Sequence, residues 1–112
     1  MKEDIIANES EWVKYLPKSF KIANHTFKVV QYNELFSDDD LIWGCFCYTD
    51  LEICIRIKND GKEVSEEIIR NTFYHELFHT FNYLWNTDTD EALAQSFANF
   101  MREFETTSNY GS

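Results

Sequence analysis

The segment SEEIIRNTFYHELFHTFNYLW, residues 65–85, carries the clearest helix pattern in the chain. Ser65 is a favoured helix-capping residue, and Glu66 and Glu67 follow it where acidic side chains complement the positive end of the helix dipole. Apolar residues then recur at helical spacing, at Ile69, Phe73, Leu77, Phe81 and Leu84. The sequence therefore predicts a central helix from about Ser65 to Trp85 that is packed against the core.

A strand hairpin is expected before this helix, over residues 41–58. With a turn at Thr49-Asp50, alternate side chains fall on opposite faces of the hairpin. One face then carries the apolar residues Phe46, Tyr48, Leu51, Ile53, Ile55 and Ile57. The same register places Cys45 opposite Cys54 on the other face. We therefore predict a hairpin with one buried face, and its first strand is a candidate for the edge of a sheet.

The remaining elements complete an α+β fold. A short helix is expected at Glu9–Leu16, ended by Pro17, and strands are expected at Ser19–Ala23 and Thr26–Tyr32 with a turn between them. A polar break follows the central helix, and a last helix is expected over Asp90–Phe104. Because the break is short, this last helix is expected to fold back antiparallel to the central one.

Length and charge restrict the organisation and the partners. The 112 residues suffice for one domain, which we place at residues 1–105 with a flexible tail at 106–112. The net charge of −10 repels phosphate backbones and anionic lipid headgroups, so we expect neither nucleic acid nor membrane as a partner. No apolar segment follows Met1-Lys2-Glu3-Asp4, as a signal peptide would require, so a cytoplasmic protein is expected. In that reducing compartment the three cysteines are expected to be free thiols.

The predicted central helix contains the motif His75-Glu76-Leu77-Phe78-His79. Histidines four residues apart project from one helix face, so both imidazoles can bind a single zinc ion at about 2.0–2.1 Å. Glu76 is rotated around the helix from that pair, where it can take a proton from water instead of binding the metal. The alternative is a histidine pair that only packs against the sheet. The spacing favours one zinc ion per chain, with Glu76 as the candidate catalytic residue.

A catalytic zinc ion needs a third protein ligand. The preferred candidate is Glu91, twelve residues after His79 and at the start of the last helix. Ala94 and Ala98 follow on its helix stripe, where small side chains let two helices approach closely. The alternative ligands are Asp90, Asp88 and His25. Glu91 could instead complete a helix capping box with Asp88.

The hairpin, the helix with His-Glu-Leu-Phe-His and the segment DEALAQSFA, residues 90–98, together resemble the zincin-like metallopeptidases. They are most similar to the minimal ones of bacteriophages and to the ImmA/IrrE-type proteins, over Trp43–Phe104. The resemblance implies a small twisted antiparallel sheet packed on a helix that holds zinc through two histidines and a downstream glutamate. The chain departs from the pattern at Gln95, where we associate an acidic residue with the family, and in the short loop between the helices.

The expected function is hydrolysis of a peptide bond in a peptide or protein substrate by a gluzincin-like zinc metallopeptidase. The unpaired sheet edge could hold the substrate by adding it as a strand. Candidate donors to the developing oxyanion are Tyr83, Arg70, His25 and Tyr110. One alternative is a zinc-stabilised binding or regulatory protein without turnover, and another is a zinc-free interaction module. Glu76 favours the enzyme, since a structural zinc site has no use for a carboxylate beside an open position.

Overall fold

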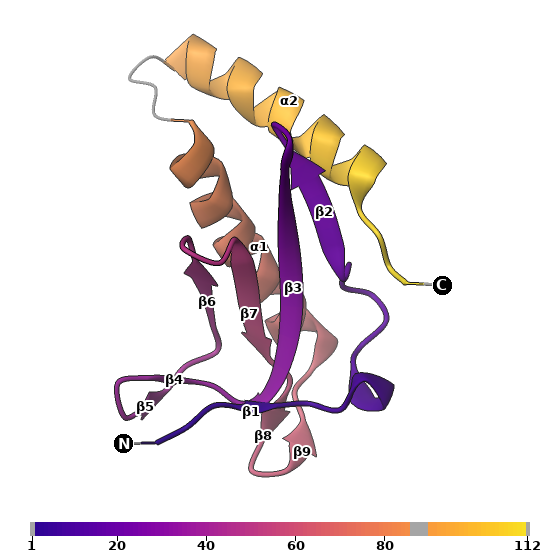
Figure 1. Ribbon diagram of the computed structural model, residues 1–112, viewed down its shortest axis with the longest axis vertical. Coiled ribbons are helices and arrows are strands. Elements are labelled where there is room, and N and C mark those ends of the chain that lie inside the picture. The colour runs from indigo at the N-terminus through magenta and orange to yellow at the C-terminus, as the bar shows by residue number, and fades with distance from the viewer. Residues whose placement is uncertain (1, 86–89, 112) are drawn as a thin grey trace.

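The computed structural model describes residues 2–85 and 90–111, and at positions 90–92 and 94 it describes the backbone alone. The fold is α+β, with one sheet of five strands and two helices against one face of it (Figure 1). The sheet contains β1 (Ile5–Ile6), β2 (Ser19–Ile22), β3 (His25–Glu34), β6 (Gly44–Cys47) and β7 (Glu52–Arg56). Two small ribbons pair β4 (Phe36–Ser37) with β5 (Asp40–Leu41), and β8 (Lys58–Asn59) with β9 (Lys62–Glu63). The helices are α1 (Glu66–Leu84) and α2 (Asp90–Thr107).

The sheet is mixed, so the antiparallel sheet expected from the family resemblance is wrong. The long strand β3 pairs antiparallel with β1 and β2, but its other neighbour, β7, runs parallel to it with Val29 opposite Ile53. The β6–β7 hairpin has its second strand next to β3, which leaves β6 outside. This order follows from burial, since Ile53 and Ile55 of β7 are completely buried whereas the residues of β6 are only half-buried.

The β2–β3 hairpin agrees closely with the sequence prediction. Its turn lies at Ala23-Asn24, one residue earlier than predicted, and these residues have φ values of 50° and 67°. Asn tolerates this left-handed region better than most residues, which explains why the turn forms there.

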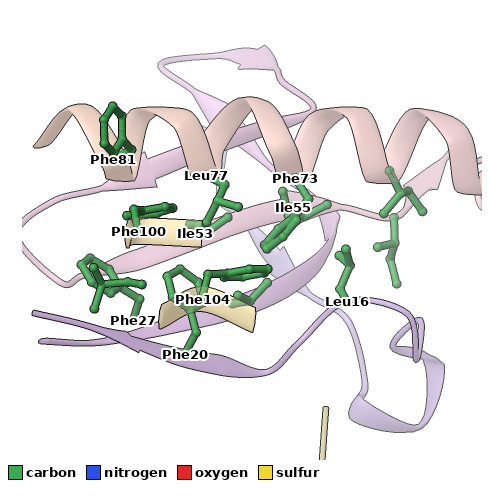
Figure 2. Close-up of a cluster of buried hydrophobic side chains, with 14 of the residues drawn as sticks. Leu16, Phe20, Phe27, Ile53, Ile55, Phe73, Leu77, Phe81, Phe100 and Phe104 are labelled. Carbon is green, nitrogen blue, oxygen red and sulfur yellow. The ribbon is translucent and has the colours of Figure 1, made fainter. Parts of the chain in front are cut away.

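The main core lies between the sheet and the two helices (Figure 2). The predicted stripe of α1 is confirmed at four positions that are almost fully buried, Ile69, Phe73, Leu77 and Phe81. They meet Phe20 and Phe27 from the β2–β3 hairpin and Phe100 and Phe104 from α2. Each such side chain contributes about 1.5–3 kcal/mol when it is fully buried, so this aromatic-rich layer is the main source of stability.

The opposite face of the β6–β7 hairpin is also buried, which corrects the prediction of a single buried face. Cys54 packs there with Tyr32 and Leu35 in a second, smaller cluster. Arg56 is buried beside them, where its Nε donates to the Ile42 carbonyl at 3.1 Å. Alternation alone could not reveal this layer, because the residues that cover it come from the chain around the β4–β5 ribbon.

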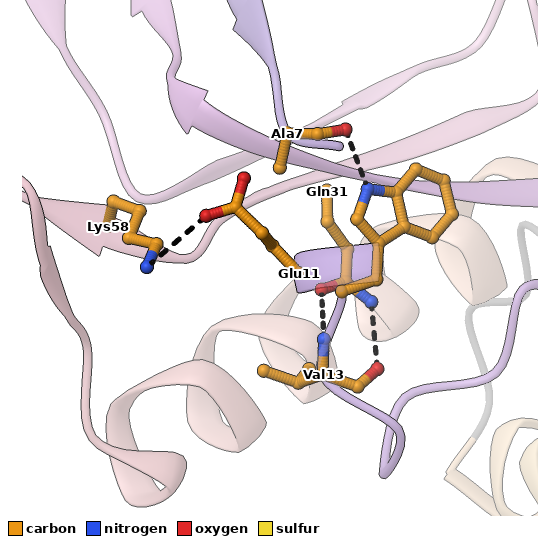
Figure 3. A network of polar contacts seen from close by, with 6 residues as sticks. Ala7, Glu11, Val13, Gln31 and Lys58 are labelled. Carbon is orange, nitrogen blue, oxygen red and sulfur yellow. Dashed lines mark hydrogen bonds and ion pairs between the residues drawn. The ribbon is translucent and has the colours of Figure 1, made fainter. Parts of the chain in front are cut away.

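Residues 9–16 do not form the predicted helix, and only Glu9–Glu11 make a short 3-10 turn. The side chain of Gln31 binds the backbone of Val13 instead, accepting from its N–H at 2.8 Å and donating to its carbonyl at 3.1 Å (Figure 3). Trp12 adds a hydrogen bond from its indole N–H to the Ala7 carbonyl at 3.0 Å. These tertiary bonds fix the segment beside β3 in a conformation of bends and turns and outweigh its local helix propensity.

Helix α2 begins where predicted and ends three residues later, at Thr107. It returns from the end of α1 in the opposite general direction and lies against β2 (Figure 1). The segment after α2, for which a flexible tail was predicted, is bound to β2 at one residue. The Asn109 N–H donates to the Ser19 carbonyl at 2.8 Å, and the Asn109 carbonyl accepts from the Lys18 N–H at 2.6 Å. Neither helix, over the residues described, has the length and apolarity needed to cross a membrane.

Gly44 lies where α1 comes close to the sheet, and we expect Gly44→Ala to destabilise the protein by about 1–3 kcal/mol. A Cβ at this position would lie 2.7 Å from Thr72 Cγ2 and 3.0 Å from the Cys54 carbonyl oxygen. Urea unfolding measures the loss. In a Thr72→Ser background, which removes Cγ2 and keeps the hydroxyl, the same substitution should cost clearly less. An equal cost in both backgrounds would contradict this explanation.

Candidate metal centre

The candidate centre lies in the middle of α1, away from both helix ends. Ser65 caps the helix as predicted, its Oγ accepting from the Ile68 N–H at 3.4 Å, and the helix ends at Trp85. His75 and His79 lie at least one full turn from either end. Their backbone is therefore fixed by intrahelical hydrogen bonds, and their relative position depends only on side-chain rotamers.

The two histidines meet as the motif predicts. Both side chains are exposed, and the Nε2 atoms of His75 and His79 are 3.0 Å apart. Two nitrogens that bind one tetrahedral zinc ion at about 2.0–2.1 Å are about 3.3–3.4 Å apart. The pair therefore fits a shared ion after a movement of a few tenths of an ångström. The same distance also suits an N–H···N hydrogen bond, so a metal titration is needed to separate the two interpretations.

Unlike the two exposed histidines, Glu76 is buried, with 6% of its surface exposed. Burial raises the pKa of its carboxyl group, because the charged form loses hydration. The neighbouring imidazoles of His75 and His79 act in the opposite direction and lower it. Glu76 is thus a poorly hydrated carboxylate close to both histidines. This environment suits a group that accepts a proton better than one that only carries a surface charge.

Strand β6 lies beside this part of α1 and forms one edge of the sheet. The Arg56 N–H donates to the Trp43 carbonyl at 2.8 Å, which fixes the alternation of hydrogen bonds along the ladder. By that alternation, Gly44 and Phe46 direct their own N–H and C=O groups away from β7, toward the open edge. The sequence prediction that the first hairpin strand lies at a sheet edge is therefore confirmed.

The flank of α1 that faces this edge also carries the histidines. Thr72 contacts Gly44, and Tyr83 packs on Phe46 with ring centroids 5.6 Å apart. Helical periodicity places residues 72, 76, 79 and 83 along one line of the helix, so His79 lies between these two contacts. An extended peptide added to β6 would consequently pass close to His79.

The third ligand is not identified by the described side chains. The backbone of Glu91 and Asp90 lies in the first turn of α2, but their side chains and the whole of Asp88 fall outside the described residues. Among the described side chains, no three histidines, cysteines or carboxylates gather where they could hold a metal ion. His25, which is described, begins β3 beside Phe27 and does not join the histidine pair.

Several secondary predictions are not supported. Gln95 is exposed and donates to Asn99 at 3.1 Å instead of supporting a histidine. Ala98 is exposed, so it does not mediate a close approach of the helices. Large aromatic rings form the contacts between α1 and α2 instead. The ring centroid of Phe81 lies 5.2 Å from that of Phe97 and 5.5 Å from that of Phe100. The helices are therefore held apart by aromatic bulk.

Among the candidate oxyanion donors, Tyr83 has the best position. Arg70 is engaged by Glu66 at 2.8 Å and lies over the ring of Tyr15. Tyr83 stands one turn beyond His79 and is half exposed. Gly44 is a further position that the sequence could have indicated, because a single glycine within a predicted strand is a recognised sign of close backbone approach.

Comparison of the chain with protein-family models, with curated proteins and with solved structures finds no match.

Proposed function

We propose that this chain is a zincin-like zinc metallopeptidase that hydrolyses peptide bonds. His75, His79 and Glu91 hold one zinc ion in this proposal, and Glu76 is the general base. The observation that carries it is the exposed pair of Nε2 atoms 3.0 Å apart, next to a buried carboxylate and an open sheet edge. The proposal also rests on the resemblance of the sequence motifs over residues 43–104 to the zincin-like pattern.

The chain's own residues account for binding and proton transfer. A bound zinc ion would supply the Lewis acidity that polarises a substrate carbonyl and makes water acidic. Glu76 accepts a proton from the attacking water and later delivers it to the leaving amine, and its poor hydration raises its affinity for that proton. In this proposal Tyr83, one turn beyond His79, would donate a hydrogen bond toward the reacting carbonyl.

The open edge of β6 provides the substrate site in this proposal. An extended peptide would form backbone hydrogen bonds with the outward groups of Gly44 and Phe46, which favours binding independent of sequence. The net charge of −10 favours neutral or basic peptides over acidic ones. The exposed rings of Tyr48 and Tyr83, 6.1 Å apart at the end of this edge, offer an apolar contact for one substrate side chain.

Zinc binding is the first test. We expect one zinc ion per chain by plasma emission, and we expect Glu91→Ala to weaken zinc affinity by more than the roughly 10- to 100-fold that loss of an outer-shell partner costs. Glu105→Ala, an exposed glutamate of the same helix, is the matched control and should bind zinc normally. Absence of zinc from the reconstituted wild type would overturn the proposal. Loss of affinity in Asp90→Ala but not in Glu91→Ala would transfer the ligand role to Asp90.

A zinc-stabilised binding protein is the second candidate, and exposed aromatic residues around the motif favour it. Tyr74, Phe78 and Tyr83 each have about half of their surface exposed on α1, at 51%, 50% and 51%. Such rings are typical anchors of protein interfaces. This candidate predicts zinc binding without peptide hydrolysis, and it predicts that substitution of Glu76 leaves partner binding unchanged.

A further inference from the structure

Two of the three cysteines face each other across the β6–β7 hairpin, as the sequence register predicts. Cys45 is directly opposite Cys54. It occupies the same kind of ladder position as Trp43, whose carbonyl accepts from Arg56. In such hydrogen-bonded pairs the Cα atoms are about 5.5 Å apart, within the roughly 4.4–6.8 Å range that disulfides span. The Cα separation therefore permits a cross-strand disulfide, but the Cβ atoms of a hydrogen-bonded pair are about 5.5 Å apart instead of the roughly 3.5–4.5 Å of a relaxed bridge, so the bond would be strained and readily reduced.

The surroundings make the two thiols chemically unequal. Cys54 is buried, and its Sγ lies 3.3 Å from Glu52 Oε1. A hydrogen bond from Cys54 lowers the pKa of the Cys45 thiol, while that bond and burial raise the pKa of Cys54. Tyr32 donates to the same Glu52 oxygen at 3.2 Å, which fixes the carboxylate beside the buried thiol. Cys45, which is only half-buried, is thus the nucleophile, and the buried Cys54 is the resolving thiol.

We propose that Cys45 and Cys54 form a reversible disulfide when the protein meets a low-molecular-weight disulfide such as oxidised glutathione. The Cys45 thiolate attacks one sulfur of the oxidant, forms a mixed disulfide and releases one thiolate. Cys54 then loses its proton to solvent, and its thiolate attacks the Cys45 sulfur and expels the second thiolate. The two protein thiols are oxidised to one disulfide, and the oxidant is reduced to two small thiols.

Cys47 provides an internal control, although it lies on the same face of the same strand. It is opposite Glu52 instead of a cysteine. Its Sγ contacts Asp50 Oδ2 at 3.3 Å and Thr49 Oγ1 at 3.4 Å. Because Cys47 has no cysteine opposite it, the strand register selects Cys45 as the partner of Cys54.

The disulfide would join the outer strand β6 to the buried strand β7. It closes the loop between residues 45 and 54, which restricts the unfolded chain and should raise the midpoint of thermal unfolding. Because β6 is the open edge of the sheet, the bond would also prevent this strand from separating from β7. The proposal concerns thiol chemistry alone, so it stands or falls independently of the proposed zinc enzyme.

The test uses the whole chain, incubated with oxidised glutathione and alkylated before intact-mass analysis and peptide mapping. We expect one intrachain bond between Cys45 and Cys54, one alkylated thiol at Cys47, and full reversal by dithiothreitol. Cys47→Ser should still form the bond, and Cys45→Ser should not. Three alkylated thiols in the wild type, or a mapped bond that involves Cys47, would overturn the proposal.

Discussion

Replacing Glu76 with glutamine is expected to lower peptide hydrolysis by about 10²- to 10⁴-fold, the usual contribution of a general base, while zinc stays bound. Glutamine has the same shape but cannot accept the proton of the attacking water. His75 and His79 keep their places, because the distance between their Nε2 atoms depends on α1 and not on Glu76. The measurements are peptide cleavage and zinc stoichiometry on the same preparation.

Glu67→Gln is the matched control, since Glu67 is an exposed carboxylate at the start of the same helix. It should leave both cleavage and zinc unchanged. The zinc-free Glu76→Gln variant should also unfold at a higher temperature than the zinc-free wild type at neutral pH, because it replaces a buried charge whose pKa is raised by desolvation. Full activity in Glu76→Gln would exclude it as the base, and zinc binding without activity in either protein would favour the binding-protein alternative.

Local patterns predicted the elements that local forces determine. The bounds of α1 follow from its Ser65 cap and its apolar stripe, and the structure agrees within one residue at each end. The register of the β6–β7 hairpin follows from alternation, which correctly paired Cys45 with Cys54. In these cases the local preference and the tertiary contacts favour the same conformation.

The differences arise where contacts distant in sequence decide the conformation. The segment before Pro17 has a helical pattern, yet Gln31 binds both backbone groups of Val13 and holds the segment in a bent, non-helical conformation. The parallel pairing of β3 with β7 depends on which hairpin strand is buried more deeply, and alternation within the hairpin does not determine this. Neither result can be derived from propensity or periodicity alone.

The candidate centre divides in the same way. The pairing of His75 with His79 is a property of one helix, so spacing alone predicted it. The third ligand depends on how α2 is oriented, and the prediction relied on Ala94 and Ala98 lying between the helices; the side chain of Ala94 falls outside the described residues. Ala98 is exposed instead, and the rings of Phe81 and Phe100 fill the contact between α1 and α2. Sequence spacing could not anticipate this, because both faces of α2 offer plausible contact residues.

The aromatic contact between α1 and α2 is where we expect the largest effect of a substitution on stability. Phe81 has only 1% of its surface exposed. Its ring lies within 6.2 Å of four others, those of Phe78, Trp85, Phe97 and Phe100. Phe81→Ala should therefore reduce the free energy of unfolding by about 3–5 kcal/mol, through lost burial and the cavity left behind. Since small domains are stable by only about 5–15 kcal/mol, this is a large fraction of the total, and urea unfolding measures it directly.

Phe78→Ala is the matched control, because Phe78 lies on the same helix with half of its surface exposed, and it should cost about 1 kcal/mol or less. The pair also tests the third ligand. Phe81 positions α2 relative to His79, so Phe81→Ala should weaken zinc binding under native conditions if a residue of α2 completes the centre, and Phe78→Ala should not. If Phe81→Ala were destabilised as expected but bound zinc with wild-type affinity, the ligands would have to lie on α1 and the sheet, and Glu91 would be excluded.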